Sequence, residues 1–270
     1  MTTVTDIFTH LNTIAPVAMK MDFDNVGHLV GRGDAEVRRV LVALDITDAV
    51  IDEAIELGAQ LIVSHHPIIL NPLRQVTDAD LTGRQILKLV RHDIAAICMH
   101  TNLDAAEGGI NDVLAERLGL CDTEILWQLG ELDGVPYGLG RIGTLSAPAD
   151  MAVFLPRVQA AVGSAGLRYH DAGRPVYKVA SMGGSGGDLV SAAMAAGCDT
   201  YVIGEAKYHA FLEARELGIN LIEADHYCTE DVISVPLRDT IRAAFPEVAV
   251  TVSARHDQVV RFYEAGGVNG

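Results

Sequence analysis

Two adjacent histidines at the end of a short apolar segment are the first residues whose type and position suggest metal chemistry. Residues 61–70 read LIVSHHPIIL, so His65 and His66 follow a strand-like segment and precede Pro67. On a continuing strand the two imidazoles would point to opposite faces, which suits two nearby metal ions better than one. An isolated His-His pair also occurs as surface or capping imidazoles, and that alternative stays open.

Other histidines and carboxylates occur where further predicted strands end. His100 and Asp104 follow the apolar segment 94–99, and His226 and Glu230 come after a later one. Both pairs have the spacing His-x-x-x-acid. Because the carboxyl ends of strands are where α/β proteins commonly hold ligands, these positions are candidate metal ligands.

Each of these residues also has an explanation without a metal. Asp104 and Glu107 have the spacing of a capping box ahead of a helix. Glu230 could interact with the dipole at a helix N-terminus, and His226 could be a buried core histidine. These alternatives weaken when the residues are considered together, because all of the candidates follow predicted strands.

A weak internal repeat relates the candidate positions to one another. Residues 37–66 align without a gap with residues 176–205 when the sequence is shifted by 139 positions, although only five of the aligned residues are identical. The pattern continues after a shorter connection in the second copy. The positions that then correspond are His100 with His226 and Asp104 with Glu230.

Short β-rich apolar segments alternate with helical patterns along the chain, which is typical of an α/β protein. The N-terminal segment has the apolar spacing of an amphipathic helix and lacks the features of a secretory signal. Strands are predicted at 38–46, 60–64 and 94–99, and helices at 47–58, 83–93 and 109–120. Together with the repeat, this pattern predicts two related α/β units.

Composition limits the class of protein. The 36 acidic residues outnumber the 20 basic ones, giving a net charge of −16, so broad nucleic-acid binding is not expected. No apolar segment approaches the length that spans a bilayer. The four cysteines form no C-x-x-C pair, which predicts reduced thiols in a cytoplasmic protein.

Three imidazoles and two carboxylates form the candidate ligand set: His65, His66, Asp104, His226 and Glu230. This mixture of donors suits Zn, Mn, Fe, Co or Ni better than Ca or Mg. Five protein ligands do not fill the coordination of two ions, and open positions favour catalysis over a structural site.

The sequence resembles the GTP cyclohydrolase 1 type 2 homologue family, also called the NIF-three-like dinuclear metal-centre proteins. The motifs span most of the chain in the order found in that family. They are MDFDNVGHLVG (21–31), SHHP (64–67), HTNLDAAEGGIND (100–112), GLGRIG (138–143), GGSGG (183–187), IGEAKYH (203–209) and ADHYCTE (224–230).

This resemblance implies two intertwined α/β units with mixed sheets flanked by helices. The first unit is expected over residues 1–126 and the second over residues 127–270, with the C-terminal segment able to pack on the first. The resemblance also implies two divalent metal ions per subunit, bound by the five candidate ligands, and a homohexameric toroid.

The resemblance further implies a metal-dependent hydrolase acting on a small molecule, with GTP cyclohydrolysis and loss of formate as the named reaction. A non-catalytic protein that binds metal or regulates through a partner is the alternative. Among residues outside the ligand set, His100 is a candidate proton shuttle or a group that supports a ligand. Glu205 is a candidate general base or a residue that orients a ligand. The alternative for His100 is a hydrogen-bonded core histidine, and the alternative for Glu205 is a place in the first turn of a helix at 205–216.

Overall fold

The computed structural model describes residues 1–263, which form two compact units. Unit 1 consists of Met1–Val113, Trp127–Gly140 and Asp231–His256. Unit 2 consists of Leu114–Leu126, Arg141–Glu230 and the described residues from Asp257 onward. Because the chain passes between the units several times, the prediction of intertwined α/β units is confirmed.

Unit 1 contains a mixed sheet with the strand order β1-β4-β3-β2-β11. Strands β2, β3, β4 and β11 are parallel to one another, whereas β1 is antiparallel to β4 at one edge. The strands are β1 (Gly27–Val30), β2 (Arg39–Ala43), β3 (Leu61–Ser64), β4 (Ala95–Cys98) and β11 (Ala249–Val252). Residues of β2, β3 and β4 are almost all buried, as expected for parallel strands covered on both faces.

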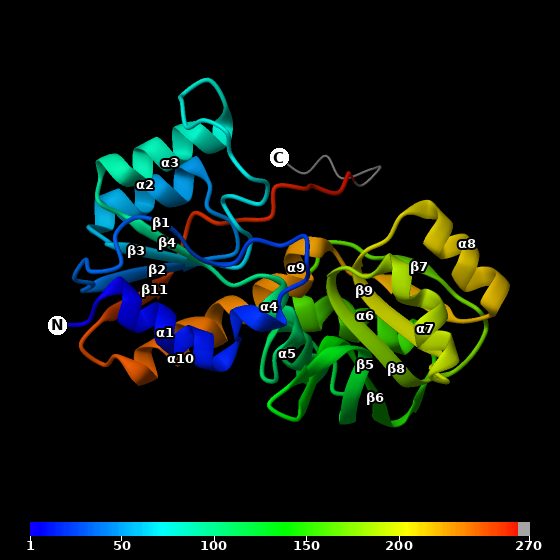
Figure 1. Ribbon diagram of the computed structural model, residues 1–270. Helices are drawn as coiled ribbons and strands as arrows, with labels where there is room; N and C mark the ends of the chain where they lie inside the picture. The colour runs from blue at the N-terminus through cyan, green and yellow to red at the C-terminus, as the bar shows by residue number, and fades with distance from the viewer. Residues whose placement is uncertain (264–270) are drawn as a thin grey trace. The chain divides into compact units, whose positions relative to one another are not determined.

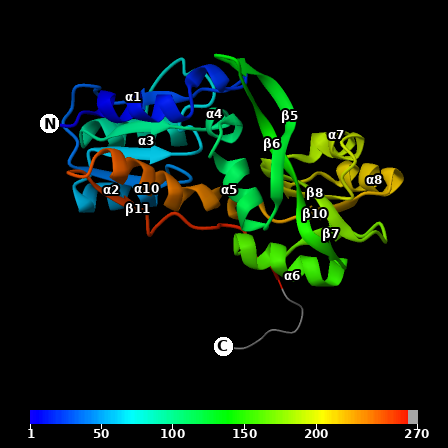
Figure 2. The same cartoon turned by 90° about the horizontal axis from the view of Figure 1, so that it is seen from below.

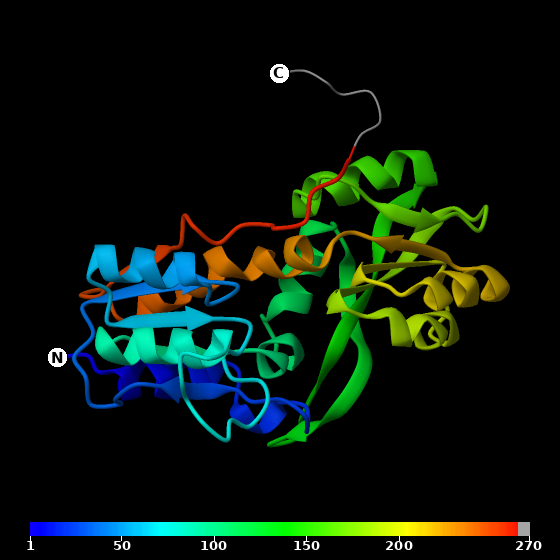
Figure 3. The ribbon, with the colours of Figure 1, turned by 90° about the horizontal axis from the view of Figure 1, so that it is seen from above.

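Helices cover both faces of this sheet. Figure 1 shows α2 and α3 over one face and α1 and α10 over the other, and Figure 3 shows α2 and α3 side by side. The helices of this part of the chain are α1 (Val4–Ile14), η1 (Val17–Met19), α2 (Asp48–Leu57), α3 (Leu81–Arg91), α4 (Thr101–Ala105), α5 (Ile110–Arg117), η3 (Asp231–Ile233) and α10 (Ser234–Ala244).

The ends of α2 illustrate how local sequence sets these elements. The Thr47 hydroxyl accepts a hydrogen bond from the Val50 N–H and begins the helix. Gly58 ends it in the left-handed conformation at φ +64°. Between these caps Ile51 and Ala54 face the core that also contains Leu41, Ile62 and Ile94. The predicted helix at 47–58 is therefore confirmed, together with the two signals that delimit it.

Unit 2 contains a second mixed sheet, with the strand order β5-β6-β8-β9-β10-β7. Strands β8, β9 and β10 are parallel, whereas β6 and β7 are antiparallel to their neighbours. The strands are β5 (Cys121–Leu132), β6 (Val135–Ala149), β7 (Arg168–His170), β8 (Val176–Ser185), β9 (Thr200–Glu205) and β10 (Asn220–Glu223).

Helices also cover both faces of the second sheet. In Figure 2, α6 lies on the opposite face of this sheet from α7 and α8. The helices are α6 (Met151–Val162), η2 (Gly187–Leu189), α7 (Val190–Ala195), α8 (Tyr208–Leu217) and α9 (His226–Glu230).

The two units repeat one order of elements, which confirms the internal repeat. In unit 1 the parallel strands β2, β3 and β4 alternate with α2 and α3, and α4 follows. In unit 2 the parallel strands β8, β9 and β10 alternate with α7 and α8, and α9 follows. The antiparallel strands β1 and β7 occupy equivalent places beside β4 and β10. Within residues 1–263, no helix is both long enough and apolar enough to traverse a bilayer.

Candidate metal centre

His65 and His66 lie directly after β3, where the strand has already ended. Their backbone N–H groups donate to the carbonyls of Ala43 and Leu44 at 3.3 and 2.9 Å, and the Ser64 hydroxyl donates to the His66 carbonyl at 2.9 Å. The strand therefore does not continue through the pair, and the ring centroids lie only 4.8 Å apart. Opposite faces were expected only for a continuing strand, and this condition is not met because β3 ends at Ser64.

The next parallel strand, β4, positions two more candidate residues in unit 1. His100 precedes α4 and Asp104 lies within it. The ring of His100 lies 5.0 Å from the ring of His65 and 5.6 Å from that of His66, centroid to centroid. One ligand nitrogen from each of the three rings lies within 4.8 Å of the others, so this group could hold a metal ion. The Asp104 carboxylate lies beside it, 3.9 Å from His65 Nε2.

Each ring of this group has its Nδ1 atom beside an oxygen acceptor. His65 Nδ1 lies 2.8 Å from the carbonyl oxygen of Met99. His66 Nδ1 and His100 Nδ1 lie 2.8 Å from the carboxylates of Asp45 and Asp24 respectively. These acceptors assign the proton of each neutral ring to Nδ1, so Nε2 carries the lone pair. The donor set therefore fits a metal ion, because ligating histidines are typically held in this way through their other nitrogen.

Asp24 belongs to the motif MDFDNVGHLVG (21–31), but its contact with His100 was not predicted from the sequence. It is 5% exposed and accepts hydrogen bonds from the Thr101 N–H at 3.0 Å and the Thr101 hydroxyl at 2.5 Å, besides His100. Burial would raise the pKa of Asp24, but the hydrogen bonds from His100 and Thr101 outweigh burial and hold this pKa well below its usual range. Asp24 is therefore a carboxylate anion that fixes His100 and the start of α4.

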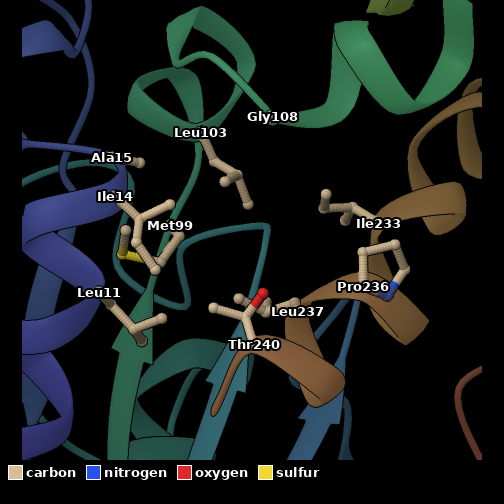
Figure 4. Close-up of a pocket in the computed structure, with 10 residues that line it drawn as sticks. All are labelled: Leu11, Ile14, Ala15, Met99, Leu103, Gly108, Ile233, Pro236, Leu237 and Thr240. Carbon is tan, nitrogen blue, oxygen red and sulfur yellow. The ribbon is translucent and has the colours of Figure 1, made fainter. Parts of the chain in front are cut away.

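A small apolar pocket lies behind α4, on the side of unit 1 formed by α1 and α10. Figure 4 shows Leu103 of α4 and Met99 of the preceding segment extending into it, with Leu11 and Leu237 on the neighbouring helices. Its volume is about 30 Å³, enough for one water molecule or a methyl group. The residues that flank His100 and Asp104 therefore face the apolar interior on one side of the helix.

In unit 2, α9 brings together the second His-x-x-x-acid pair. His226 and Glu230 are one helical turn apart, with His226 Nε2 lying 3.1 Å from Glu230 Oε2. His226 Nδ1 lies 3.0 Å from the carboxylate of Glu205. Glu230 is 4% exposed, so its carboxylate is a buried acceptor with an imidazole beside it. The His226 imidazole, which contacts Glu205 through Nδ1, and the Glu230 carboxylate could therefore also contribute ligands to a metal ion.

Two glycines allow Glu230 and its neighbour to lie close to the ends of the central strands. A Cβ atom at Gly184, which has a φ of +63°, would lie 2.0 Å from Glu230 Oε1. A Cβ atom at Gly204 would lie 2.4 Å from the hydroxyl of Thr229. Gly184 belongs to the GGSGG segment, which ends β8 and leads into η2. The glycine-rich sequence was the available signal for this close approach, and its role next to Glu230 was not recognised from it.

The structure excludes two of the alternatives considered from sequence. Asp104 lies inside α4, so it does not cap the helix that follows. Glu205 is the last residue of β9, and α8 begins only at Tyr208, so Glu205 does not belong to the first turn of that helix. Its carboxylate instead contacts His226 Nδ1, and its role in orienting a ligand stays a prediction.

Comparisons with known proteins place these features in a family. The family model described as Duf34/NIF3 (NGG1p interacting factor 3) matches residues 2–258. The chain belongs to this family. A relative from Clostridium perfringens (strain 13 / Type A), described as a GTP cyclohydrolase 1 type 2 homolog, is 33% identical over 238 residues, covering 88% of this chain and 90% of the relative. The resemblance inferred from the motifs is therefore confirmed.

Solved structures of NIF3-like proteins have the same fold. A Bacillus cereus protein related to NIF3 superimposes with a TM-score of 0.91 at 26% identity, covering 97% of this chain and 99% of that one. A hypothetical protein of Staphylococcus aureus superimposes with a TM-score of 0.88 at 29% identity over the same shares of the two chains. These matches confirm the predicted α/β fold with mixed sheets over nearly the whole chain.

Proposed function

We propose that this NIF3-family chain binds two divalent metal ions and uses them to hydrolyse a small molecule. The proposed ligands are His65, His66, Asp104, His226 and Glu230. The observation that carries the proposal is the group of three imidazoles in unit 1, whose ligand atoms lie within 4.8 Å of one another. The acceptors at the Nδ1 atoms of His65 and His66 support it further, because they leave Nε2 of each ring as the metal-binding nitrogen.

The donor types support two ions of a particular class. Each unit offers both imidazole nitrogen and carboxylate oxygen, and five such ligands leave coordination positions for substrate and water. Imidazole-rich sites suit Zn, Fe, Mn, Co or Ni, whereas Ca and Mg prefer sites made of oxygen. We therefore propose one of the transition metals or zinc as the native ion.

The ions would supply Lewis-acid chemistry and make water more acidic. His100 and Glu205 are the proposed catalytic residues. His100 can accept a proton at Nε2, and the buried Asp24 carboxylate at its Nδ1 would stabilise the resulting cation. The Glu205 side chain is 58% exposed while it contacts His226, so it can exchange protons with solvent.

GTP is the first substrate to test, because the curated relatives are named GTP cyclohydrolase 1 type 2 homologs. In that reaction water opens the imidazole ring of the base and formate leaves. The second candidate is a non-catalytic metal-binding protein that acts through a partner. The exposed apolar side chains of Leu70, Leu73 and Val76, on the loop that follows His66, favour this alternative.

The same resemblance leads us to propose a homohexameric toroid in the cytoplasm. Within the described residues none of the four cysteines forms a disulfide, which supports a reducing compartment. A mass measurement in solution tests the assembly.

The proposal is tested by metal analysis of protein purified without added ions, followed by incubation of the same metal-loaded samples with GTP. We expect two equivalents of metal per subunit in the wild-type protein and formate release that depends on the metal. Asp104→Ala should lower metal occupancy while the fold persists. Asp78→Ala, which removes an exposed carboxylate from the loop before α3, is the matched control and should retain the wild-type content.

Full occupancy in Asp104→Ala would refute the ligand assignment. If metal binds but no formate appears with Mn, Fe, Zn or Co, GTP cyclohydrolysis is excluded. Binding without turnover of nucleotides, phosphoesters or amides would favour the non-catalytic alternative.

A further inference from the structure

Arg168 and Glu223, on neighbouring strands of unit 2, form a bidentate ion pair. Glu223 lies three residues before His226 in the sequence. Arg168 begins β7 and Glu223 ends β10, and they are direct partners in the antiparallel register. Arg168 Nε donates to Glu223 Oε1 at 2.8 Å, and Arg168 Nη2 donates to Glu223 Oε2. The Glu223 side chain is only 15% exposed, so the pair is better ordered than an ordinary surface ion pair.

Both members of this pair also bind the backbone of one buried residue, Ala206. The Ala206 N–H donates to Glu223 Oε2 at 2.9 Å, and the Ala206 carbonyl accepts from Arg168 Nη2 at 2.8 Å. Because the donor and the acceptor of this residue are both held, the direction in which the chain leaves β9 is fixed.

The residue immediately before Ala206 is Glu205, whose carboxylate contacts His226 Nδ1 at 3.0 Å. The side chains of Glu205 and His226 are 58% and 38% exposed, so packing alone does not fix their geometry. The backbone of Glu205 must therefore be held from elsewhere if its carboxylate is to stay on Nδ1. The contacts of Arg168 and Glu223 with Ala206 meet this requirement.

We propose that Arg168 and Glu223 are positioning residues for His226, acting through Ala206 and Glu205. They hold the Glu205 carboxylate where it fixes the tautomer and orientation of the His226 ring. This inference rests on the proposed function, in which His226 is a metal ligand. It concerns residues that do not themselves contact the metal, and it predicts that metal affinity depends on an ion pair at the edge of the sheet.

A structural role for Arg168 is the competing explanation, since its guanidinium also lies 5.3 Å from the centre of the Phe211 ring in α8. The two explanations differ in one respect. A residue that only stabilises the sheet affects unfolding regardless of Glu205, whereas a positioning residue affects metal affinity only while Glu205 can hold His226. A double-mutant cycle separates them.

The experiment uses full-length wild-type protein, Arg168→Met, Glu205→Ala and the double variant, because alanine removes the acceptor at His226 Nδ1. The affinity for Zn²⁺ is measured by competition with a chromophoric chelator, and the unfolding of each metal-free protein by urea. Methionine keeps an apolar stem of similar length over Phe211 but removes the hydrogen bonds of Arg168 to Glu223 and to the Ala206 carbonyl. Arg215→Met is the matched control, because Arg215 pairs with Glu216 on the exposed surface of α8.

We expect Arg168→Met to weaken Zn²⁺ binding about tenfold, within the range typical of residues that support metal ligands. In the Glu205→Ala background the same substitution should cause little further loss. Arg168→Lys should give an intermediate affinity, because an ammonium group cannot contact Glu223 and Ala206 with the geometry of a guanidinium. Arg215→Met should bind Zn²⁺ as the wild-type protein does.

Equal losses of affinity in both backgrounds, or wild-type affinity in Arg168→Met, would overturn the positioning role. Failure of the wild-type protein to bind any of Zn²⁺, Mn²⁺, Fe²⁺, Co²⁺ and Ni²⁺ would instead refute the proposed function. If Arg168→Met does not fold, Arg168→Lys and Glu223→Gln, which preserve more of the packing, provide the same comparison.

Discussion

At the scale of single residues, each histidine of the candidate site forms a hydrogen bond through its Nδ1 atom, and this bond matters as much as the presence of the imidazole. Three imidazoles are held by carboxylates, namely His66 by Asp45, His100 by Asp24 and His226 by Glu205, and His65 is held by a backbone carbonyl. Such contacts orient the ring and leave its other nitrogen available for a metal ion or a proton.

Gly184 provides a test at this scale, because an added side chain has no room beside Glu230. In Gly184→Ala the new Cβ atom would lie 2.0 Å from Glu230 Oε1, so the carboxylate must move. We expect a lower metal content and a loss of stability greater than the roughly 1 kcal/mol that a left-handed alanine costs. Metal analysis and urea unfolding measure the two effects.

Gly197→Ala is the matched control for this substitution. Gly197 has a φ of +79°, and a Cβ atom added there would have no neighbouring atom within 4 Å, so alanine incurs only the conformational cost. Equal metal contents in Gly184→Ala and Gly197→Ala would contradict the idea that Gly184 makes room for a ligand.

At the scale of elements, the short helices α4 and α9 do most to position the candidate ligands. Each follows the third parallel strand of its unit, and each carries an acidic residue close to the preceding histidine. Helices this short have little stability of their own, so their ends must be fixed by tertiary contacts or caps. Asp24 does this for α4 by accepting from the Thr101 N–H, and Asp225 does it for α9 by accepting from the Cys228 N–H at 3.1 Å.

Asp225 allows the role of the cap to be tested. It has a φ of +78°, a conformation that asparagine also tolerates but alanine does not. We expect Asp225→Ala to lose about 1–2 kcal/mol of unfolding free energy and part of the metal content. Asp225→Asn should retain most of both. Calorimetry and metal analysis check these outcomes.

Asp133→Ala is the control for backbone strain. Asp133 also has a positive φ, +53°, but it lies in the turn between β5 and β6, away from α9 in sequence. A loss of metal content in Asp133→Ala as large as in Asp225→Ala would show that the effect comes from general destabilisation rather than from the cap of α9.

At the scale of the whole molecule, the chain completes unit 1 only near its C-terminal end. Strand β11 pairs with β2, and α10 packs against β11 and α1. Leu237 and Ile241 of α10 are buried. Residues 1–126 by themselves would therefore expose the edge of β2 and the part of the sheet face that α10 covers.

We accordingly expect a fragment of residues 1–126 to be unfolded or aggregated. The same fragment joined through a flexible linker to residues 231–256 should show cooperative urea unfolding, because these residues supply α10 and β11. Circular dichroism and gel filtration compare the two proteins. Cooperative unfolding of the fragment 1–126 alone would contradict this prediction.

The sequence by itself determined the class of fold, the internal repeat, several of the strands and helices of unit 1, and the residues with the chemistry to bind metal. These properties depend on local signals: apolar periodicity, caps such as Thr47 and Gly58, and the recurrence of His-x-x-x-acid after strands. The family motifs pointed to the same ligand set that residue type and spacing had already selected, and this set stays a prediction.

Only the tertiary structure decided how the rings of His65 and His66 approach each other and which carboxylates hold the histidines. His66 meets Asp45, and His100 meets Asp24, across 21 and 76 residues of sequence. The directions of these side chains depend on where β3 ends and on how separate strands pair. No periodicity or spacing along the chain encodes those contacts, because they arise from packing between distant segments.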